Sequence, residues 1–116
     1  MNLTQTQTLQ GAAIFGGGAG MMVTGTLTSD GSTSISFAPL LYAGIISGKA
    51  SYNPVGLGFY VVGDQIIWST VATKWRIYKN AVIVFESSEN VATPDLVTTW
   101  TPVGAATGTP TVTAIL

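Results

Sequence analysis

Ionised side chains are scarce in this chain, and their scarcity constrains its fold and its partners more than any other feature. Four Lys or Arg and five Asp or Glu occur among 116 residues, which gives a net charge of −1. A folded monomer of this size exposes about 6,000 Å² of surface, and ordinary soluble surfaces carry about 25–35% charged residues. A free single copy of this composition is expected to associate or precipitate.

Three explanations for so few charges are open: a polar but uncharged surface, insertion into a membrane, or burial of the surface against other copies or partners. Threonine recurs along the whole chain, which favours the first explanation. No apolar run reaches 18 residues, so membrane insertion is not expected. Burial against other molecules is compatible with a threonine-rich surface and stays open.

The composition also excludes several kinds of chemistry. The chain has no Cys and no His, so it has no disulfide scaffold, no zinc-ribbon site and no Ser-His-Asp triad. Four cations are too few for the electrostatic footprint of a nucleic-acid-binding protein. The acidic residues Glu86 and Glu89 lie on a predicted strand end and loop, where solvated side chains are the simplest interpretation. We therefore expect no enzyme activity and no cofactor.

Short apolar stretches separated by turn residues predict an all-β fold. Gly63-Asp64 and Lys79-Asn80 suit two-residue hairpin loops, where Gly and Asn tolerate a positive φ, Asp30-Gly31 is a further hairpin signal, and Ser47-Gly48 predicts a turn. About eight to nine strands at turn spacings of 8–12 residues predict a single-domain antiparallel β-sandwich or barrel. The clearest predicted strands are 40–46, 57–62, 65–70, 75–78, 81–86, 96–100 and 111–115, with a further turn at 53–56.

The pattern within three of these stretches predicts which faces are buried. Trp75 and Ile77 alternate with polar neighbours, as in a strand with one buried face. Segment 40–46 is apolar and predicts a buried strand, and segment 81–86 lacks alternation, so we expect it to be covered on both faces. The basic residues of 74–79 are expected on an exposed strand face, where charge discourages edge-to-edge pairing.

Residues 1–23 differ from the rest and predict an extended N-terminal arm before a β-domain spanning 24–116. The segment 11–23 is apolar and rich in glycine, which costs conformational entropy in any regular element. Such an arm cannot form a compact core alone, but it can lie against a neighbouring copy and satisfy its backbone there. The candidate assembly interface comprises Ile14, Phe15, Met21, Met22 and Val23.

The aromatic residues offer a second candidate surface. Exposed rings at strand spacing can form a flat platform that stacks on sugars, which would make the chain a carbohydrate-binding or adhesion module. Large aromatics also supply much of the core of a small β-domain, or they can line a subunit interface. The glycan hypothesis requires at least two exposed, coplanar rings among Tyr60, Trp68, Trp75 and Trp100.

The second half of the chain carries a set of distinctive motifs: SGKASY at 47–52, Phe59-Tyr60, Trp68, Trp75 and ESSENVATPDLVTTWTPVGAATGTPTVTA at 86–114. Over about residues 47–114 the chain therefore resembles a small β-module that recurs in bacteriophage virion structural proteins and in large bacterial surface proteins. The usual Gly in the turn after RIYK is replaced here by Asn80-Ala81.

This resemblance implies a structural β-domain without catalytic residues, such as a capsid decoration (cement) protein or a fibre or tail component. The partners it implies are other copies of the chain or a major capsid or tail protein, with neither nucleic acid nor a membrane involved. The first cation is Lys49, so no positively charged signal-peptide region precedes it. We therefore expect synthesis in the host cytoplasm and a final place in the virion, with glycan binding as the alternative.

Overall fold

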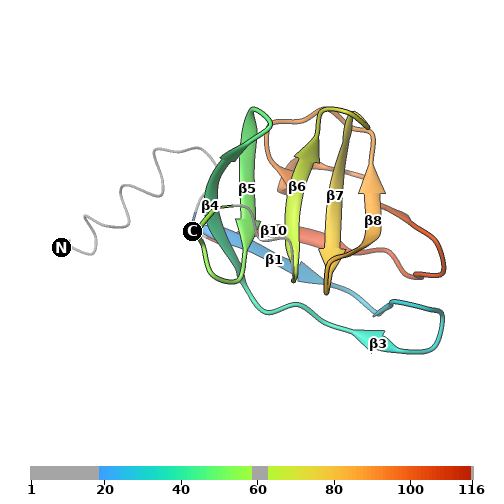
Figure 1. Cartoon of the computed structure of the whole chain (residues 1–116). Helices are drawn as coiled ribbons and strands as arrows, with labels where there is room; N and C mark the ends of the chain where they lie inside the picture. Colours follow the sequence, from blue (N-terminus) through green and yellow to red (C-terminus); the bar gives the residue numbers. More distant parts are fainter. Residues whose placement is uncertain (1–18, 59–62, 116) are drawn as a thin grey trace.

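The computed structural model describes residues 19–58 and 63–115, and these residues adopt an all-β fold (Figure 1). They contain ten strands and one short 3-10 helix, η1. The elements in chain order are β1 (Gly20–Thr24), β2 (Leu27–Thr28), β3 (Ser34–Ile35), β4 (Leu40–Ile46), β5 (Lys49–Asn53), β6 (Gln65–Ser69), β7 (Lys74–Lys79), β8 (Val82–Ser87), η1 (Pro94–Leu96), β9 (Thr101–Pro102) and β10 (Thr111–Ile115).

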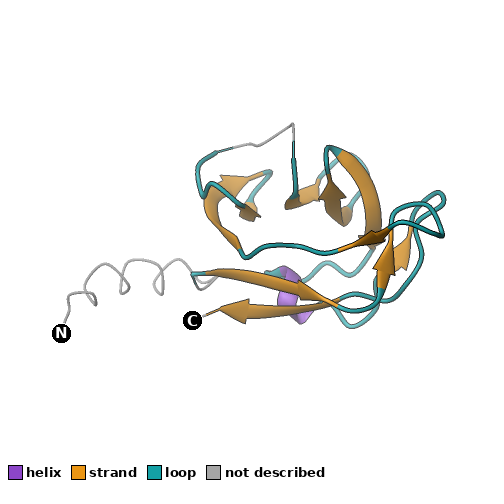
Figure 2. Cartoon of the chain, turned by 90° about the horizontal axis from the view of Figure 1, so that it is seen from below, coloured by secondary structure: helices purple, strands orange, loops and turns teal. Residues whose placement is uncertain are grey.

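Eight strands form one antiparallel sheet in the order β10-β1-β4-β5-β6-β7-β8-β9, and β2 and β3 form a separate hairpin. The run from β4 to β9 follows the chain, which is a meander, as short turns between strands predict. In Figure 2 several meander strands are seen nearly end-on while β1 and β10 run across them, so the curled sheet makes two crossed layers. The prediction of an all-β antiparallel fold is confirmed.

Strand β4 belongs to both layers, and a bulge lets it do so. Its first residues pair with β1 (Leu40 with Met21), and the rest of it pairs with β5. The register shifts between Tyr42 and Gly44, where the backbone of Gly44 has a φ of 108°. A bulge bends its strand and increases the local twist. Gly44 therefore supplies the conformation that lets β4 turn from one layer into the other.

Burial along β4 and β8 differs in part from the prediction. The prediction of a buried strand at 40–46 is confirmed for Leu40 and Ala43 but is wrong for Leu41 and Ile45, which are 43% and 61% exposed. In β8, Val84 and Phe85 are both buried although they are neighbours, whereas Val82 is exposed. The prediction that 81–86 is covered on both faces is therefore confirmed only at the centre of the strand, where a register shift in the pairing with β7 accompanies the double burial.

Two tight turns are built from residues whose backbone has a positive φ. Ser47 and Gly48 have φ values of 55° and 84° and connect the paired residues Ile46 and Lys49, as predicted. The β7–β8 turn lies one residue later than predicted, because Asn80 and Ala81 are its two central residues, with φ values of 51° and 69°. Positive φ at both central positions is characteristic of the type I′ hairpin turn.

Ala81 occupies a position that favours glycine, and this gives a first prediction. Replacing Ala81 with Gly is expected to raise the free energy of unfolding by about 0.5–1 kcal/mol, because relief of the left-handed backbone outweighs the added chain entropy of glycine. Urea unfolding of the wild type and Ala81→Gly measures the change. A lower midpoint for Ala81→Gly would contradict this account of the turn.

The segment predicted as a strand at 96–100 is instead η1 followed by extended chain. Pro94 begins the helix, where a fixed φ and a missing N–H are tolerated. The closing strand β9 comes later and is two residues long, with Pro102 in it. Of the predicted strand 57–62, Leu57 and Gly58 are not in a strand, and residues 59–62 lie outside the described residues.

The N-terminal boundary of the domain also differs from the prediction. Residues Gly20–Thr24 are strand β1, which pairs with β10 along its whole length and with β4 at Gly20 and Met21. The β-domain therefore starts before residue 24, and the expected arm can comprise at most the residues before Ala19. Residues 1–18 lie outside the described residues.

Both end strands of the sheet carry features that discourage pairing with another sheet. β9 is short and contains Pro102, which has no backbone N–H to donate. β10 is the other end strand, and it contacts η1. Short edges, proline and a covering segment are common ways in which natural sheets avoid edge-to-edge association. Contacts with other molecules are therefore better sought on the faces of the sheet.

Candidate functional site

The tryptophans that could have formed a glycan platform are buried. Trp68, Trp75 and Trp100 are 6%, 0% and 4% exposed, and Tyr60 lies outside the described residues. Trp68 and Trp75 are cross-strand partners whose rings meet edge to face, with centroids 5.9 Å apart. The three tryptophans therefore belong to the core, and the interpretation of them as an exposed platform is wrong.

A lysine is enclosed with this aromatic pair. Lys49 Nζ lies 4.8 Å from the centroid of the Trp68 ring and donates a hydrogen bond to the Val91 carbonyl at 2.9 Å. The indole Nε1 of Trp75 donates to the same carbonyl at 3.1 Å. An aromatic face and a carbonyl oxygen thus stabilise the ammonium group where no carboxylate pairs with it. The contacts also tie the loop after β8 to β5 and β7.

The proposed assembly residues of the N-terminal segment divide into two groups. Met21 and Val23 are 0% and 4% exposed and fill the core of their own chain, while Met22 on the opposite face is half-buried. The expectation that these residues lie on a free arm is wrong, because β1 is held between β4 and β10. Ile14 and Phe15 lie outside the described residues.

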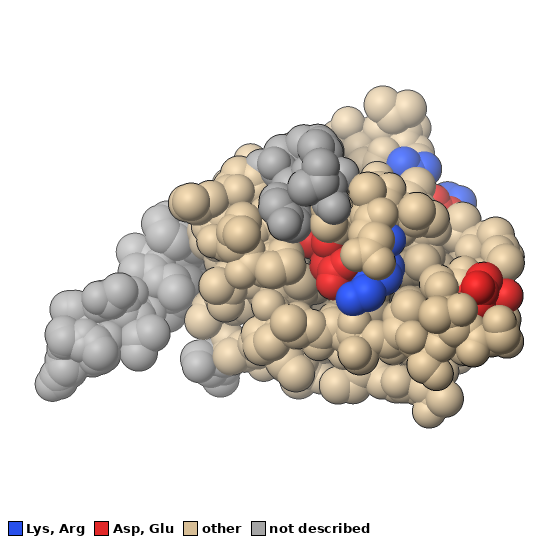
Figure 3. Space-filling view, turned by 60° about the horizontal axis from the view of Figure 1, so that its bottom comes forward, with Lys and Arg blue, Asp and Glu red and all other residues tan. Residues whose placement is uncertain are grey.

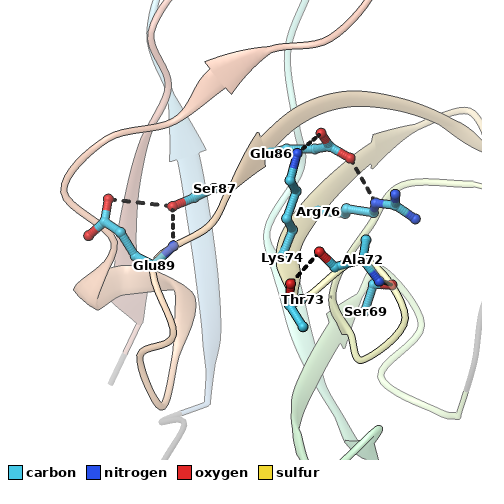
Figure 4. Close-up of polar contacts among 8 residues, drawn as sticks. All are labelled: Ser69, Ala72, Thr73, Lys74, Arg76, Glu86, Ser87 and Glu89. Atoms are coloured by element: carbon cyan, nitrogen blue, oxygen red, sulfur yellow. Dashed lines mark hydrogen bonds and ion pairs between the residues drawn. The ribbon is translucent and has the colours of Figure 1, made fainter.

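One carboxylate on the outer face of the meander forms ion pairs with two cations. Glu86 Oε2 lies 2.8 Å from Arg76 Nε, and Glu86 Oε1 lies 3.3 Å from Lys74 Nζ (Figure 4). Burial lowers the pKa of Arg76, but hydrogen bonds to Glu86 and Tyr78 outweigh it and hold that pKa above its ordinary value. The cluster keeps a surplus of one positive charge, so the predicted exposed basic face is largely paired.

Lys79, the third basic residue of this stretch, lies at the other end of β7 and makes a separate set of contacts. Lys79 Nζ donates to Asp64 Oδ2 at 2.9 Å and to the Ser36 carbonyl at 2.6 Å, and it lies 4.9 Å from the centroid of the Phe37 ring. Asp64 Oδ1 also accepts a hydrogen bond from the backbone N–H of Asn80. The ion pair joins the end of β7 to the residue before β6, and the hydrogen bond to Ser36 joins it to the segment before β4, so the role of Lys79 is structural.

Two further carboxylates accept hydrogen bonds from backbone N–H groups. Glu89 accepts hydrogen bonds from the backbone N–H groups of Thr98 and Thr99 at 2.9 and 2.7 Å, which lower its pKa. The interpretation of Glu89 as a simply solvated loop residue is therefore wrong. Asp30 Oδ1 accepts from the N–H groups of Ser32 and Thr33, and these bonds lower its pKa to about 2.

These two carboxylates predict a loss of stability in acid. The pKa of Asp30 is about 2 in the folded chain and about 4 when unfolded, so its contribution is complete above pH about 4 and is lost as the pH falls through about 2. The pKa of Glu89 is also lowered in the folded chain, so its protonation in acid likewise reduces the free energy of unfolding. Urea midpoints of the wild type and Asp30→Asn at pH 7, 4 and 2.5 test this. We expect a shallower acid decline for Asp30→Asn, and an identical decline would contradict it.

Asp95 differs from the other eight charged side chains. It is the only one that makes no hydrogen bond or ion pair with another described residue. Burial and, after it, the charge of Asp95 raise the pKa of Tyr52. The next residue, Leu96, is 53% exposed, so η1 presents an apolar side chain directly beside a carboxylate.

The candidate site is an apolar groove on the outer face of the meander, between the β4–β5 and β6–β7 turns. Ile67 and Arg76 are cross-strand partners and share this face, opposite to the face of Trp75 and Ile77. The groove has a volume of about 310 Å³. Its lining comprises Ile46, Ser47, Ile67, Trp68, Ser69, Thr70, Val71, Arg76 and Tyr78.

The tip of the β6–β7 turn forms one rim of this groove. Ser69 Oγ accepts a hydrogen bond from the Ala72 backbone N–H at 3.1 Å, which closes the turn and leaves Val71 97% exposed (Figure 4). Sequence reasoning missed the groove, although a valine among turn residues was a signal that could have pointed to it. A larger hollow of about 600 Å³ lies between the β2–β3 hairpin and the β7–β8 turn, and Lys79 lines it.

The described surface combines these few paired charges with exposed apolar side chains. Figure 3 shows Lys or Arg beside Asp or Glu near the centre of the view, an acidic group alone at its right edge, and wide areas without charge between them. The large apolar side chains exposed by 43% or more are Leu41, Ile45, Val55, Leu57, Val71, Val82 and Leu96.

Comparison with protein-family models, curated proteins and solved structures finds no match. The resemblance to a phage β-module stays a prediction. No helix among residues 19–58 and 63–115 is long and apolar enough to cross a membrane. The same residues hold no group of three or more acidic side chains that could bind a metal ion.

Proposed function

We propose that this chain is a non-enzymatic structural component of a phage particle, as a capsid decoration (cement) protein or a fibre or tail component. It acts through contacts of the folded β-domain with other copies of itself or with a major capsid or tail protein. The resemblance of residues 47–114 supplies the virion part of this proposal. The surface of the described domain supports the part that concerns association.

The exposed apolar side chains carry the proposal. Among residues 19–58 and 63–115, seven large apolar side chains are exposed, while eight of the nine charged side chains are engaged in hydrogen bonds or ion pairs within the chain. Charges paired in this way contribute less to repulsion between molecules, and apolar side chains favour association when they are removed from water. Because β9 is short and contains Pro102, and β10 contacts η1, this association is expected to use the sheet faces and turn tips.

Two measurements on the full chain test the proposed function. Sedimentation velocity gives the mass in solution, which for a single copy is 12.0 kDa, and co-sedimentation with virus-like particles of the same phage measures binding. We expect masses that are multiples of the single copy, or saturable binding to the particles, or both. A chain that remains a single copy and does not bind particles would refute the proposal.

A further inference from the structure

We propose that the groove between the β4–β5 and β6–β7 turns binds η1 of a second copy, so that copies join head to tail. In this contact Leu96 of one copy enters the groove of the next, and Asp95 of the first faces the Arg76 cluster of the second. The inference rests on the proposed self-association, and it assigns the two surfaces that make the contact.

The charges of the two surfaces are complementary. The group formed by Lys74, Arg76 and Glu86 has a surplus of one positive charge, and its carboxylate is already shared between both cations. Asp95 brings a negative charge that pairs with no described residue of its own chain. The hydrogen bond from Arg76 to Glu86 uses the Nε–H of the guanidinium group. A guanidinium has further N–H donors, which can bind a second carboxylate.

The apolar parts of the two surfaces also match. Leu96 stands beside Asp95 and is 53% exposed. Ile46, Ile67 and Arg76 all line the groove, Ile67 is the cross-strand partner of Arg76, and the 97% exposed Val71 lies on the rim. A leucine next to a carboxylate therefore fits an apolar lining next to a cation. Association would remove from water both Val71, the most exposed apolar side chain of the described surface, and Leu96.

The positions of the two surfaces determine the kind of assembly. The groove lies on the outer face of β6 and β7, whereas η1 contacts β10, so the two surfaces belong to different parts of the chain. A contact between two different surfaces leaves one groove and one η1 free on every dimer. Such heterologous contacts continue into a ring when the rotation closes and into a filament when it does not. Both outcomes suit a component of a symmetric particle.

Complementation between two full-length variants tests this contact. Val71→Asp places a charge at the groove, and Leu96→Asp places one on η1, and both positions are exposed enough for folding to be retained. We expect each variant alone to sediment as a single copy. An equimolar mixture restores one intact groove and one intact η1, so it is expected to form 1:1 dimers and nothing larger. Circular dichroism of each variant confirms its fold.

Val82→Asp is the matched control. Val82 is 61% exposed on β8 but lines neither the groove nor η1, so this variant is expected to assemble like the wild type. Assembly of Val71→Asp or Leu96→Asp alone, or a mixture without dimers, overturns the head-to-tail contact. A wild-type chain that stays a single copy but binds particles overturns the contact and leaves the proposed function standing, whereas one that does neither overturns both.

Discussion

Replacing Trp75 with alanine is expected to lower the free energy of unfolding by about 3–5 kcal/mol. The Trp75 side chain is fully buried, packs edge to face on Trp68 and donates a hydrogen bond to the Val91 carbonyl. Its removal leaves a cavity in the core and leaves that carbonyl with Lys49 as its remaining donor. Small domains are stable by about 5–15 kcal/mol, so this loss is a large part of the total. Urea unfolding followed by circular dichroism measures it.

Two phenylalanine variants separate ring packing from the hydrogen bond. Trp75→Phe keeps an aromatic ring but loses the bond to Val91, which costs about 1 kcal/mol beyond the loss of volume. Trp100 is also buried, but its Nε1 meets no acceptor among the described residues, so Trp100→Phe loses no such bond. We expect Trp75→Phe to be the more destabilised variant. Equal losses would show that the hydrogen bond contributes nothing.

The parts of the fold that could be predicted from sequence depend on neighbouring residues. Ser47-Gly48 and Asn80 were recognised as turn residues because a positive φ is a local requirement that few residue types meet. The alternation around Trp75 and Ile77 likewise predicted their burial, because one buried face produces that pattern directly. The all-β class followed from the number of such segments.

The parts that could not be predicted depend on residues far apart in the chain. The pairing of β1 with β10 joins segments that lie far apart in the chain, and without it Met21 and Val23 resemble a free arm. The role of Glu89 depends on the amides of Thr98 and Thr99, which only the folded loop brings to it. The groove arises from two turns whose nearness is set by the meander.

The candidate site likewise could be predicted from local sequence only in part. The sequence identifies the tryptophans as candidate binding residues because large aromatic rings can stack on a ligand. In the structure these rings fill the core. Val71 and Leu96 were not marked, because a single apolar residue in a turn or short helix has no periodic pattern to identify it. Their exposure becomes evident only when the neighbouring elements are in place. Candidate contact residues in such a chain are therefore found from the surface and not from periodicity.

Replacing Gly108 with alanine is expected to lower the free energy of unfolding by about 3 kcal/mol or more. Gly108 has a φ of 106°, which side-chain-bearing residues rarely adopt, and this alone costs about 1–3 kcal/mol. An added Cβ would also collide with the Thr26 carbonyl oxygen and would lie 2.9 Å from Leu27 Cδ2. Because a backbone atom cannot move aside as a flexible side chain can, the bridge between Thr28 and Thr107 would be strained as well.

Gly104→Ala is the matched control for this close approach. Gly104 also has a positive φ, of 63°, but an added Cβ there meets no described atom within 4 Å. It is therefore expected to cost only the backbone conformation, about 1–2 kcal/mol. Chemical denaturation of both variants gives the difference between their losses of stability. This difference measures the cost of the close approach between Gly108 and Thr26. If the two variants lose the same stability, the approach of Gly108 to Thr26 does not constrain the fold.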